Sequence, residues 1–238
     1  MEKHRRTHKW AFPLGVLLSA LAMVGVVTLV MWLVDGIKLR IDNPREKQEY
    51  QAFLAKIIVH DPDPFDDVRT VPAARIPQLL DISIWSILRG DGVTPTSFPR
   101  DDDTGELLIA QALVEAEYQK IFGETPQLHE SIEGSDYDFP YDAEAKVYRV
   151  PVTGSMAIYL PRITEINKIG GRIELTVDYL AYNDFTLNAN GTYREPDQPA
   201  KVMVITLYTQ ADPDAPYRVG AIRHPLSQDY VGGGARLG

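Results

Sequence analysis

An unbroken run of uncharged residues, from Ala11 to Val34, constrains this chain more than any other feature of its sequence. The run is 24 residues long, and Ser19 and Thr28 are its only hydroxylic residues. At about 1.5 Å per residue, a helix of this length crosses the hydrocarbon core of a bilayer, about 30 Å thick, with some tilt. The run therefore predicts a transmembrane helix over residues 11–34.

A cleaved signal peptide is the alternative, because Ala20-Leu21-Ala22 resembles a cleavage site. Signal peptides have an apolar run of roughly 7–15 residues, and cutting here would leave a second apolar stretch at the new N-terminus. Trp10 and Trp32 also lie near the two ends of the run, where interfacial aromatic residues are enriched. We therefore expect the run to be retained as an anchor.

The charges that flank the run predict its orientation. Four basic residues precede it, against the single acid Glu2: Lys3, Arg5, Arg6 and Lys9. The residues that follow mix both signs: Asp35, Lys38, Arg40 and Asp42. Because basic residues favour the cytoplasmic side, residues 1–10 are predicted to be a cytoplasmic tail and the chain after residue 34 to be extracytoplasmic. The predicted location is the cell membrane, with a single pass.

The exported part is acidic and contains no cysteine. The chain has 24 basic and 33 acidic residues, and the first 34 residues hold four of the basic and one of the acidic ones. The remainder therefore has 20 against 32, a net charge of −12. Such a surface argues against nucleic acid as a partner, since phosphates need clustered Lys and Arg. Zero cysteines exclude disulfides, thiolate metal sites and cysteine nucleophiles. This composition suits a bacterial envelope protein.

Residues 35–74 are predicted to form a juxtamembrane helix and a proline-rich linker. Asn43 is a suitable N-cap, Pro44 suits the first helical position and Glu46 falls at the capping-box position. An apolar stripe with helical spacing follows: Tyr50, Phe53, Leu54, Ile57 and Ile58. The stripe is expected to pack on its own domain. The alternative is that it pairs with another chain above the membrane.

Residues 75–226 are predicted to be an α+β domain that begins with two helices. The first covers residues 77–89, with Gly90 at its end. The second is expected to have Asp103 as its N-cap, Glu106 three residues later and Gly123 at its end. Its predicted inner face contains three apolar residues, with Ala112 beside them: Ile109, Leu113 and Ala116.

From about residue 128 the apolar period changes from 3.6 to 2, which indicates strands. Five segments are involved: "KVYRVPV", "MAIYLPRITEINK", "RIELTVDY", "AKVMVITLYT" and "PYRVGAIRH". Gly170-Gly171 predicts a hairpin and Asn190-Gly191 a tight turn, while Pro161 predicts an edge strand that is broken or bulged there. Residues 227–238 are predicted to be a flexible tail.

The order of these elements over residues 76–224 resembles the NTF2-like and cystatin-like folds. That resemblance implies helices packed on a curved antiparallel sheet of about five or six strands. It rests on element order alone and implies a fold without implying a function.

Three acidic stretches are the candidates for metal or ligand binding. They are Asp101, Asp102 and Asp103; His60 with Asp61, Asp63, Asp66 and Asp67; and Asp136, Asp138 and Asp142 between tyrosines. The first lacks EF-hand spacing and is interpreted as a helix cap, the second as a solvated linker, and the third as turn and sheet residues. A weak cation site at the second stretch and a carbohydrate platform at the third are the alternatives.

No catalytic motif is recognised. His60, His129 and His224 are the exported histidines, and none lies in a triad-like motif. The sequence around Ser155 is not a nucleophile elbow. We therefore assign no catalytic, cofactor-binding or metal residues and expect a non-enzymatic, membrane-anchored interaction or scaffold domain. Its partner would be a protein or cell-envelope material. The alternative is a ligand-binding or hydrolytic domain with a pocket between helices and sheet.

Overall fold

The computed structural model describes residues 43–90, 92–133, 137–152 and 157–225. The chain divides into two compact units, residues 1–46 and 47–238, and nearly all of the described residues belong to the second. Within the described part, none of the helices combines the length and the apolar character that crossing a bilayer requires. The run Ala11–Val34 lies outside the described residues, as do the predicted tails 1–10 and 227–238.

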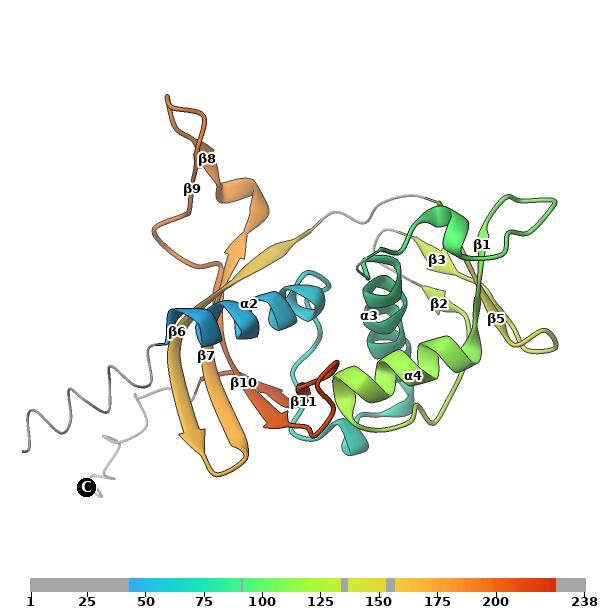
Figure 1. Cartoon of the computed structure of the whole chain (residues 1–238), viewed down its shortest axis with the longest axis horizontal. Coiled ribbons are helices and arrows are strands. Elements are labelled where there is room, and N and C mark those ends of the chain that lie inside the picture. The colour runs from blue at the N-terminus through green and yellow to red at the C-terminus, as the bar shows by residue number, and fades with distance from the viewer. Residues whose placement is uncertain (1–42, 91, 134–136, 153–156, 226–238) are drawn as a thin grey trace, which may run out of the picture. The chain divides into compact units, whose positions relative to one another are not determined.

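The described part is an α+β structure with three α-helices and several antiparallel sheets (Figure 1). The helices are α2 (Pro44–Ile58), α3 (Ile76–Leu88) and α4 (Gln111–Phe122). A four-stranded sheet has the order β11-β10-β7-β6, formed by β6 (Tyr159–Ile169), β7 (Arg172–Ala181), β10 (Lys201–Thr209) and β11 (Tyr217–Arg223). A three-stranded sheet has the order β1-β5-β4, formed by β1 (Leu107–Ala110), β4 (Tyr141–Asp142) and β5 (Val147–Val150).

Two further sheets have two strands each, and short 3-10 turns complete the described structure. The strand pairs are β2 (Ile132–Glu133) with β3 (Asp138–Phe139), and β8 (Thr186–Leu187) with β9 (Tyr193–Arg194). The 3-10 turns are η1 (Val68–Thr70), η2 (Ala73–Arg75), η3 (Pro95–Ser97) and η4 (Tyr182–Asp184).

Helix α2 begins as its sequence predicts. The side chain of Asn43 accepts the N–H of Arg45 at 3.2 Å, which makes Asn43 the N-cap. Four residues of the predicted stripe are at most 1% exposed: Tyr50, Leu54, Ile57 and Ile58. The Tyr50 ring meets Tyr217 of β11 edge to face, with centroids 5.0 Å apart. The apolar stripe therefore packs within its own domain, as expected.

The four-stranded sheet confirms the predicted hairpin. Ile169 pairs with Arg172, and Gly170 between them has a φ of +63°. Alternate residues of β7 are buried: Ile173, Leu175, Val177 and Tyr179. Strand β6 is an edge strand, as Pro161 predicted, but Pro161 stays in register with Tyr179. The irregularity falls between Ile163 and Glu165 instead.

The prediction of a single sheet of five or six strands was wrong, because these strands divide between a sheet of four and a sheet of three (Figure 1). Strand β5 does not join β6. It pairs with β4, and on its other side with β1, a segment that precedes α4 in the chain. Pairing between segments far apart in the sequence leaves no local signal. A prediction based on element order alone therefore placed all of these strands in one sheet.

The predicted start of the helix that ends at Gly123 was also wrong. Residues 101–104 form a turn, and the chain then runs as strand β1 before α4 begins at Gln111 with Ala110 as N-cap. The alternation of burial in β1, with Leu107 at 2% and Ile109 at 0% exposure, is that of a strand. Gly123 does end α4, with a φ of +76° and its N–H bonded to the Gln119 carbonyl.

Helix α3 is largely buried. Six residues in the middle of the helix are buried: Leu79, Leu80, Ile82, Ser83, Ile84 and Trp85. The helix packs against α4, and α4 in turn contacts β11. Helix α4 therefore meets the four-stranded sheet at its β11 edge.

Candidate functional site

A cleft with a volume of about 520 Å³ opens between the three helices and the loop that joins β10 to β11. Helix α2 contributes Phe53 and Ile57, and the end of α3 contributes Ile87. The loop after α3 adds Val93 and Phe98, the β10–β11 loop adds Ala215 and Pro216, and β11 adds its first residue, Tyr217. The walls are therefore mainly apolar, as in most ligand-binding clefts.

One wall of the cleft is the apolar stripe that the sequence assigned to the core. Leu113 and Ala116 were predicted to form the inner face of their helix, but Leu113 is 48% exposed and Ala116 is also exposed. The core side of α4 is formed instead by Val114, Tyr118 and Phe122. The two predicted residues line the cleft. The α4 stripe, Leu113 and Ala116, is thus an apolar surface that the described part of the chain does not cover.

A small polar group lies within the cleft. Ser86 of α3 is 2% exposed, and its hydroxyl donates a hydrogen bond of 2.7 Å to Glu117 Oε1 of α4. The other carboxylate oxygen of Glu117 lies 3.6 Å from Lys120 Nζ. Lys56 and Asp214 complete the charged lining. The cleft therefore combines apolar walls with two cations and two anions, and its described lining carries no net charge.

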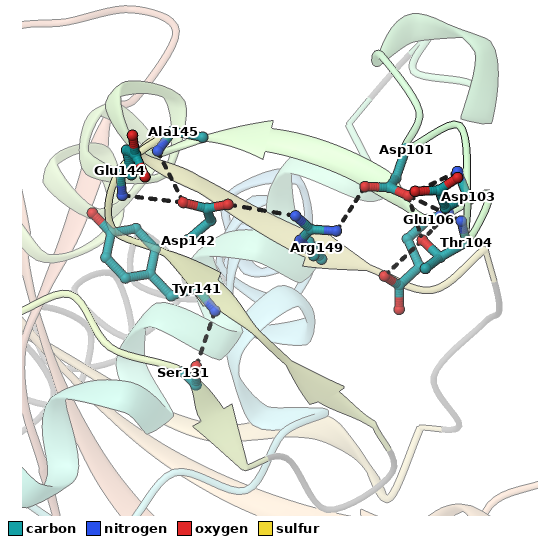
Figure 2. A network of polar contacts seen from close by, with 10 residues as sticks. All are labelled: Asp101, Asp103, Thr104, Glu106, Ser131, Tyr141, Asp142, Glu144, Ala145 and Arg149. Carbon is teal, nitrogen blue, oxygen red and sulfur yellow. Dashed lines mark hydrogen bonds and ion pairs between the residues drawn. The ribbon is translucent and has the colours of Figure 1, made fainter.

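The acidic run Asp101–Asp103 forms a turn, and Arg149 makes an ion pair with its first residue, Asp101 (Figure 2). Asp101 Oδ1 accepts the N–H groups of Asp103 and Thr104, and Asp101 Oδ2 accepts Arg149 Nη1 at 2.6 Å. The backbone N–H of Thr104 holds the pKa of Asp101 below its usual range. The backbone N–H of Asp103, the Thr104 hydroxyl and the charge of Arg149 act in the same direction. Asp102 and Asp103 are exposed. The prediction that Asp103 caps a helix was wrong, since Asp101 makes the capping bonds and shapes a turn.

Asp142 belongs to the same network. Its Oδ1 accepts the N–H groups of Glu144 and Ala145, and its Oδ2 lies 3.4 Å from Arg149 Nη2 (Figure 2). The N–H of Ala145, with Arg149, lowers the pKa of Asp142. Asp142 ends β4 at a turn, as the sequence predicted. Asp138 lies in β3, and Asp136 lies outside the described residues.

The acidic residues of "HDPDPFDD" each have a separate partner. Asp61 pairs with Lys201, Asp63 with Arg75, Asp66 with Arg223 and Asp67 with Arg69. Phe65 forms a backbone bridge with Ile222 of β11. This stretch is therefore fastened to the sheet by ion pairs and a bridge. In the described ranges, no group of three or more His, Asp or Glu side chains is arranged to hold a metal ion.

The candidate histidines do not come together. His60 Nδ1 lies 3.3 Å from Asp81, and its Nε2 is buried and has no hydrogen-bond partner among the described residues. His224 follows β11 and is exposed. Ser155 lies outside the described residues. Among the residues that the structure describes, no serine or threonine hydroxyl hydrogen-bonds to the ring of His60 or His129.

His129 lies in a polar network that the sequence did not predict. Its Nε2 bonds to Glu115 Oε1 at 3.0 Å and its Nδ1 to the Tyr148 hydroxyl at 2.8 Å. Gln111 Nε2 donates to the same Glu115 oxygen, and the Tyr141 hydroxyl donates to Gln111 Oε1. Tyr148 is fully buried, and burial raises the pKa of its hydroxyl. The network joins α4 to the three-stranded sheet, and its polar atoms are largely occupied by one another.

Comparison with known proteins does not identify a family for this chain. No family model matches the chain, and neither a curated protein nor a solved structure is significantly similar to it. The resemblance to the NTF2-like and cystatin-like folds therefore stays a prediction. A function for this chain has to be inferred from the cleft and its surroundings.

Proposed function

We propose that this chain is a membrane-anchored extracytoplasmic interaction domain and that its cleft receives an apolar segment of a protein partner. The observation that carries the proposal is the uncovered α4 stripe, Leu113 and Ala116, along one wall of a cleft of about 520 Å³. Burying such a surface against a partner would contribute about 25 cal/mol per Å² of apolar area. The anchor at residues 11–34 would hold the domain beside the membrane.

In this proposal, the polar residues Ser86, Glu117 and Lys120 fix the position of the partner segment in the cleft. Ser86 and Lys120 already contact the Glu117 carboxylate, so both of its oxygens have partners. No histidine is among the described residues that line the cleft. A non-catalytic role therefore agrees with the chemistry of the lining better than hydrolysis does.

A matched pair of α4 variants tests the proposal. Ala116 lines the cleft, whereas Ala112 is exposed on the same helix and does not line it. Ala116→Arg would fill the cleft with a long cation, and Ala112→Arg would add the same side chain outside it. The full-length proteins are purified from native membranes in mild detergent, and copurifying proteins are quantified by mass spectrometry. We expect Ala116→Arg to lose proteins that both wild type and Ala112→Arg retain. An unchanged set in Ala116→Arg would refute the proposal.

A small-molecule ligand is the second candidate, because the volume of the cleft falls within the range of small-ligand sites, about 300–1,000 Å³. Saturable binding of a small apolar fluorescent probe, abolished by Ala116→Arg and kept by Ala112→Arg, would favour this function if no protein partner is lost in the same pair.

A further inference from the structure

A protruding arm joins β7 to β10. It covers residues 182–200 and contains η4 and the small β8–β9 hairpin, which projects away from the four-stranded sheet (Figure 1). Most of its side chains are exposed, including Leu187 at 65% and Tyr193 at 71%. None of its residues lines the cleft. The arm is therefore a surface feature separate from the site of the proposed function.

The arm is held at its base. Arg162 of β6 bonds to the Asp178 carboxylate at 2.8 Å, and Asp178 is only 7% exposed. The same guanidinium reaches Glu195 Oε2 at 3.5 Å and the Pro196 carbonyl at 3.3 Å. The arm is therefore fastened to the sheet just after β9, and the turn at its tip is exposed to solvent.

The turn at the tip contains the sequence Asn190-Gly191-Thr192, which is an N-x-T acceptor sequence for N-linked glycosylation. The other four asparagines of the chain lack Ser or Thr two positions later: Asn43, Asn167, Asn183 and Asn188. All three residues of the tip sequence are exposed. The acceptor sequence thus occurs once, at a place that an enzyme can reach from solvent.

The geometry of the turn suits an acceptor asparagine. Thr192 donates two hydrogen bonds to Asn190 Oδ1, one from its N–H at 3.1 Å and one from its hydroxyl at 2.7 Å. Gly191 has a φ of +80°, a conformation that glycine adopts without strain. The carboxamide is thus held by its oxygen. In the described part of the chain, no side chain or backbone group engages Asn190 Nδ2 by a hydrogen bond, so this nitrogen is open to a glycan donor.

We propose that Asn190 is a site of N-linked glycosylation. The glycan donor would be an oligosaccharide linked to a polyprenyl diphosphate, and a membrane transferase would use the exposed tip as substrate. Asn190 Nδ2 attacks the anomeric carbon of the sugar, the bond from that carbon to the diphosphate oxygen breaks, and the polyprenyl diphosphate leaves. A base of the transferase takes the proton that Nδ2 loses. No oxidant or reductant is needed.

The experiment is peptide mass spectrometry on the full-length chain isolated from its native membrane. The tryptic peptide from Ile173 to Arg194 contains Asn190. We expect a saccharide mass on Asn190 of that peptide, lost in both Asn190→Gln and Thr192→Val. Asn183→Gln, in the same arm and the same tryptic peptide, is the matched control and should keep the saccharide. An unmodified Asn190 in the wild-type peptide, or a saccharide that survives Thr192→Val, would overturn the proposal.

The site rests on the extracytoplasmic location contained in the proposed function, and a second measurement separates the two. Because the chain contains no cysteine, Gln198→Cys at an exposed position of the arm creates a single thiol. A membrane-impermeant maleimide applied to intact cells should label this thiol. Labelling together with an unmodified Asn190 would refute glycosylation and leave the topology standing, whereas absence of labelling would refute the topology itself.

Discussion

Arg149 is the residue that decides how the acidic turns of this domain are held. Its guanidinium lies between two carboxylates, with Nη1 at 2.6 Å from Asp101 and Nη2 at 3.4 Å from Asp142. Each carboxylate also accepts two backbone N–H groups of its own turn. A side chain of the protein therefore supplies the positive charge that a bound cation would supply elsewhere.

The first prediction concerns this turn. Asp101→Ala should lower the midpoint of thermal unfolding by several degrees, because it removes the bonds to Thr104 and the ion pair with Arg149. Asp103→Ala should leave the midpoint unchanged, because the exposed Asp103 side chain caps nothing. Thermal unfolding followed by circular dichroism at neutral pH distinguishes them. Equal losses in both variants would contradict the geometry.

The second prediction concerns acid. The side chain of Arg69 lowers the pKa of Asp67 to about 2, and the pKa values of Asp101 and Asp142 are lowered as well. A carboxyl group with a depressed folded-state pKa stabilises the fold above its unfolded-state pKa, about 3.8 here, and the contribution disappears as the pH falls through the folded-state value. The denaturant midpoint should therefore fall between about pH 4 and pH 2. Asp67→Asn should reduce this drop in the midpoint. A wild-type midpoint that does not change with pH in this window would contradict the prediction.

The third prediction concerns the partly buried network around His129. Tyr148→Phe removes the hydroxyl that bonds to His129 Nδ1 and leaves that nitrogen without its partner. An unsatisfied buried polar group costs about 1–3 kcal/mol. Chemical denaturation should show a loss of this size with an unchanged denaturant slope. Tyr193→Phe, which alters an exposed tyrosine of the arm, is the control and should cost nothing measurable.

At the scale of elements, α4 shows how a glycine fixes a helix end. Gly123 has a φ of +76°, and a Cβ built there would lie 2.4 Å from Arg218 Cδ. Gly170, in the β6–β7 hairpin, has a similar φ of +63° but open space around it. The two glycines share the conformational requirement and differ only in their surroundings.

The fourth prediction follows from this difference. An L-residue in the left-handed conformation costs roughly 1–2 kcal/mol. Gly170→Ala should therefore destabilise the protein by about that amount, and Gly123→Ala by more, because Arg218 must also move. Denaturant titrations of the two variants give the comparison. Equal losses in the two variants would contradict this prediction and would show that Arg218 moves aside at no cost.

The elements that the sequence predicted well are those with local signals. Helix α2 has a capping residue and a stripe, and β6 and β7 have a Gly-Gly turn and clean alternation. The start of α4 was missed because Asp103 and Glu106 imitate a capping box, while the strand that follows is only four residues long. Its partner β5 lies about 40 residues later, so the pairing that turns Leu107–Ala110 into a strand leaves no local trace.

At the scale of the whole molecule, the cleft could not be predicted from the sequence. Its lining comes from α2, the end of α3, α4 and the β10–β11 loop, which are far apart in the chain. The only signal was the spacing of Leu113 and Ala116, and that spacing indicates an apolar face without telling whether the face is covered. Asp142 was placed correctly at a turn, but Arg149 and His129, which organise the polar networks, carry no motif.

The contact between Tyr50 and Tyr217 has a consequence for biogenesis. A chain that is synthesised from its N-terminus delivers α2 long before β11, so the buried face of α2 lacks this cover through most of synthesis. The β6–β7 hairpin can pair as it emerges, whereas Tyr50 can meet Tyr217 only after β11, the last strand of the described part, has been made. Contacts of this sequence separation slow folding, and an apolar helix face left open on a nascent chain is a target for chaperones and proteases. Synthesis of β11 is therefore the step that completes the cover of this face of α2.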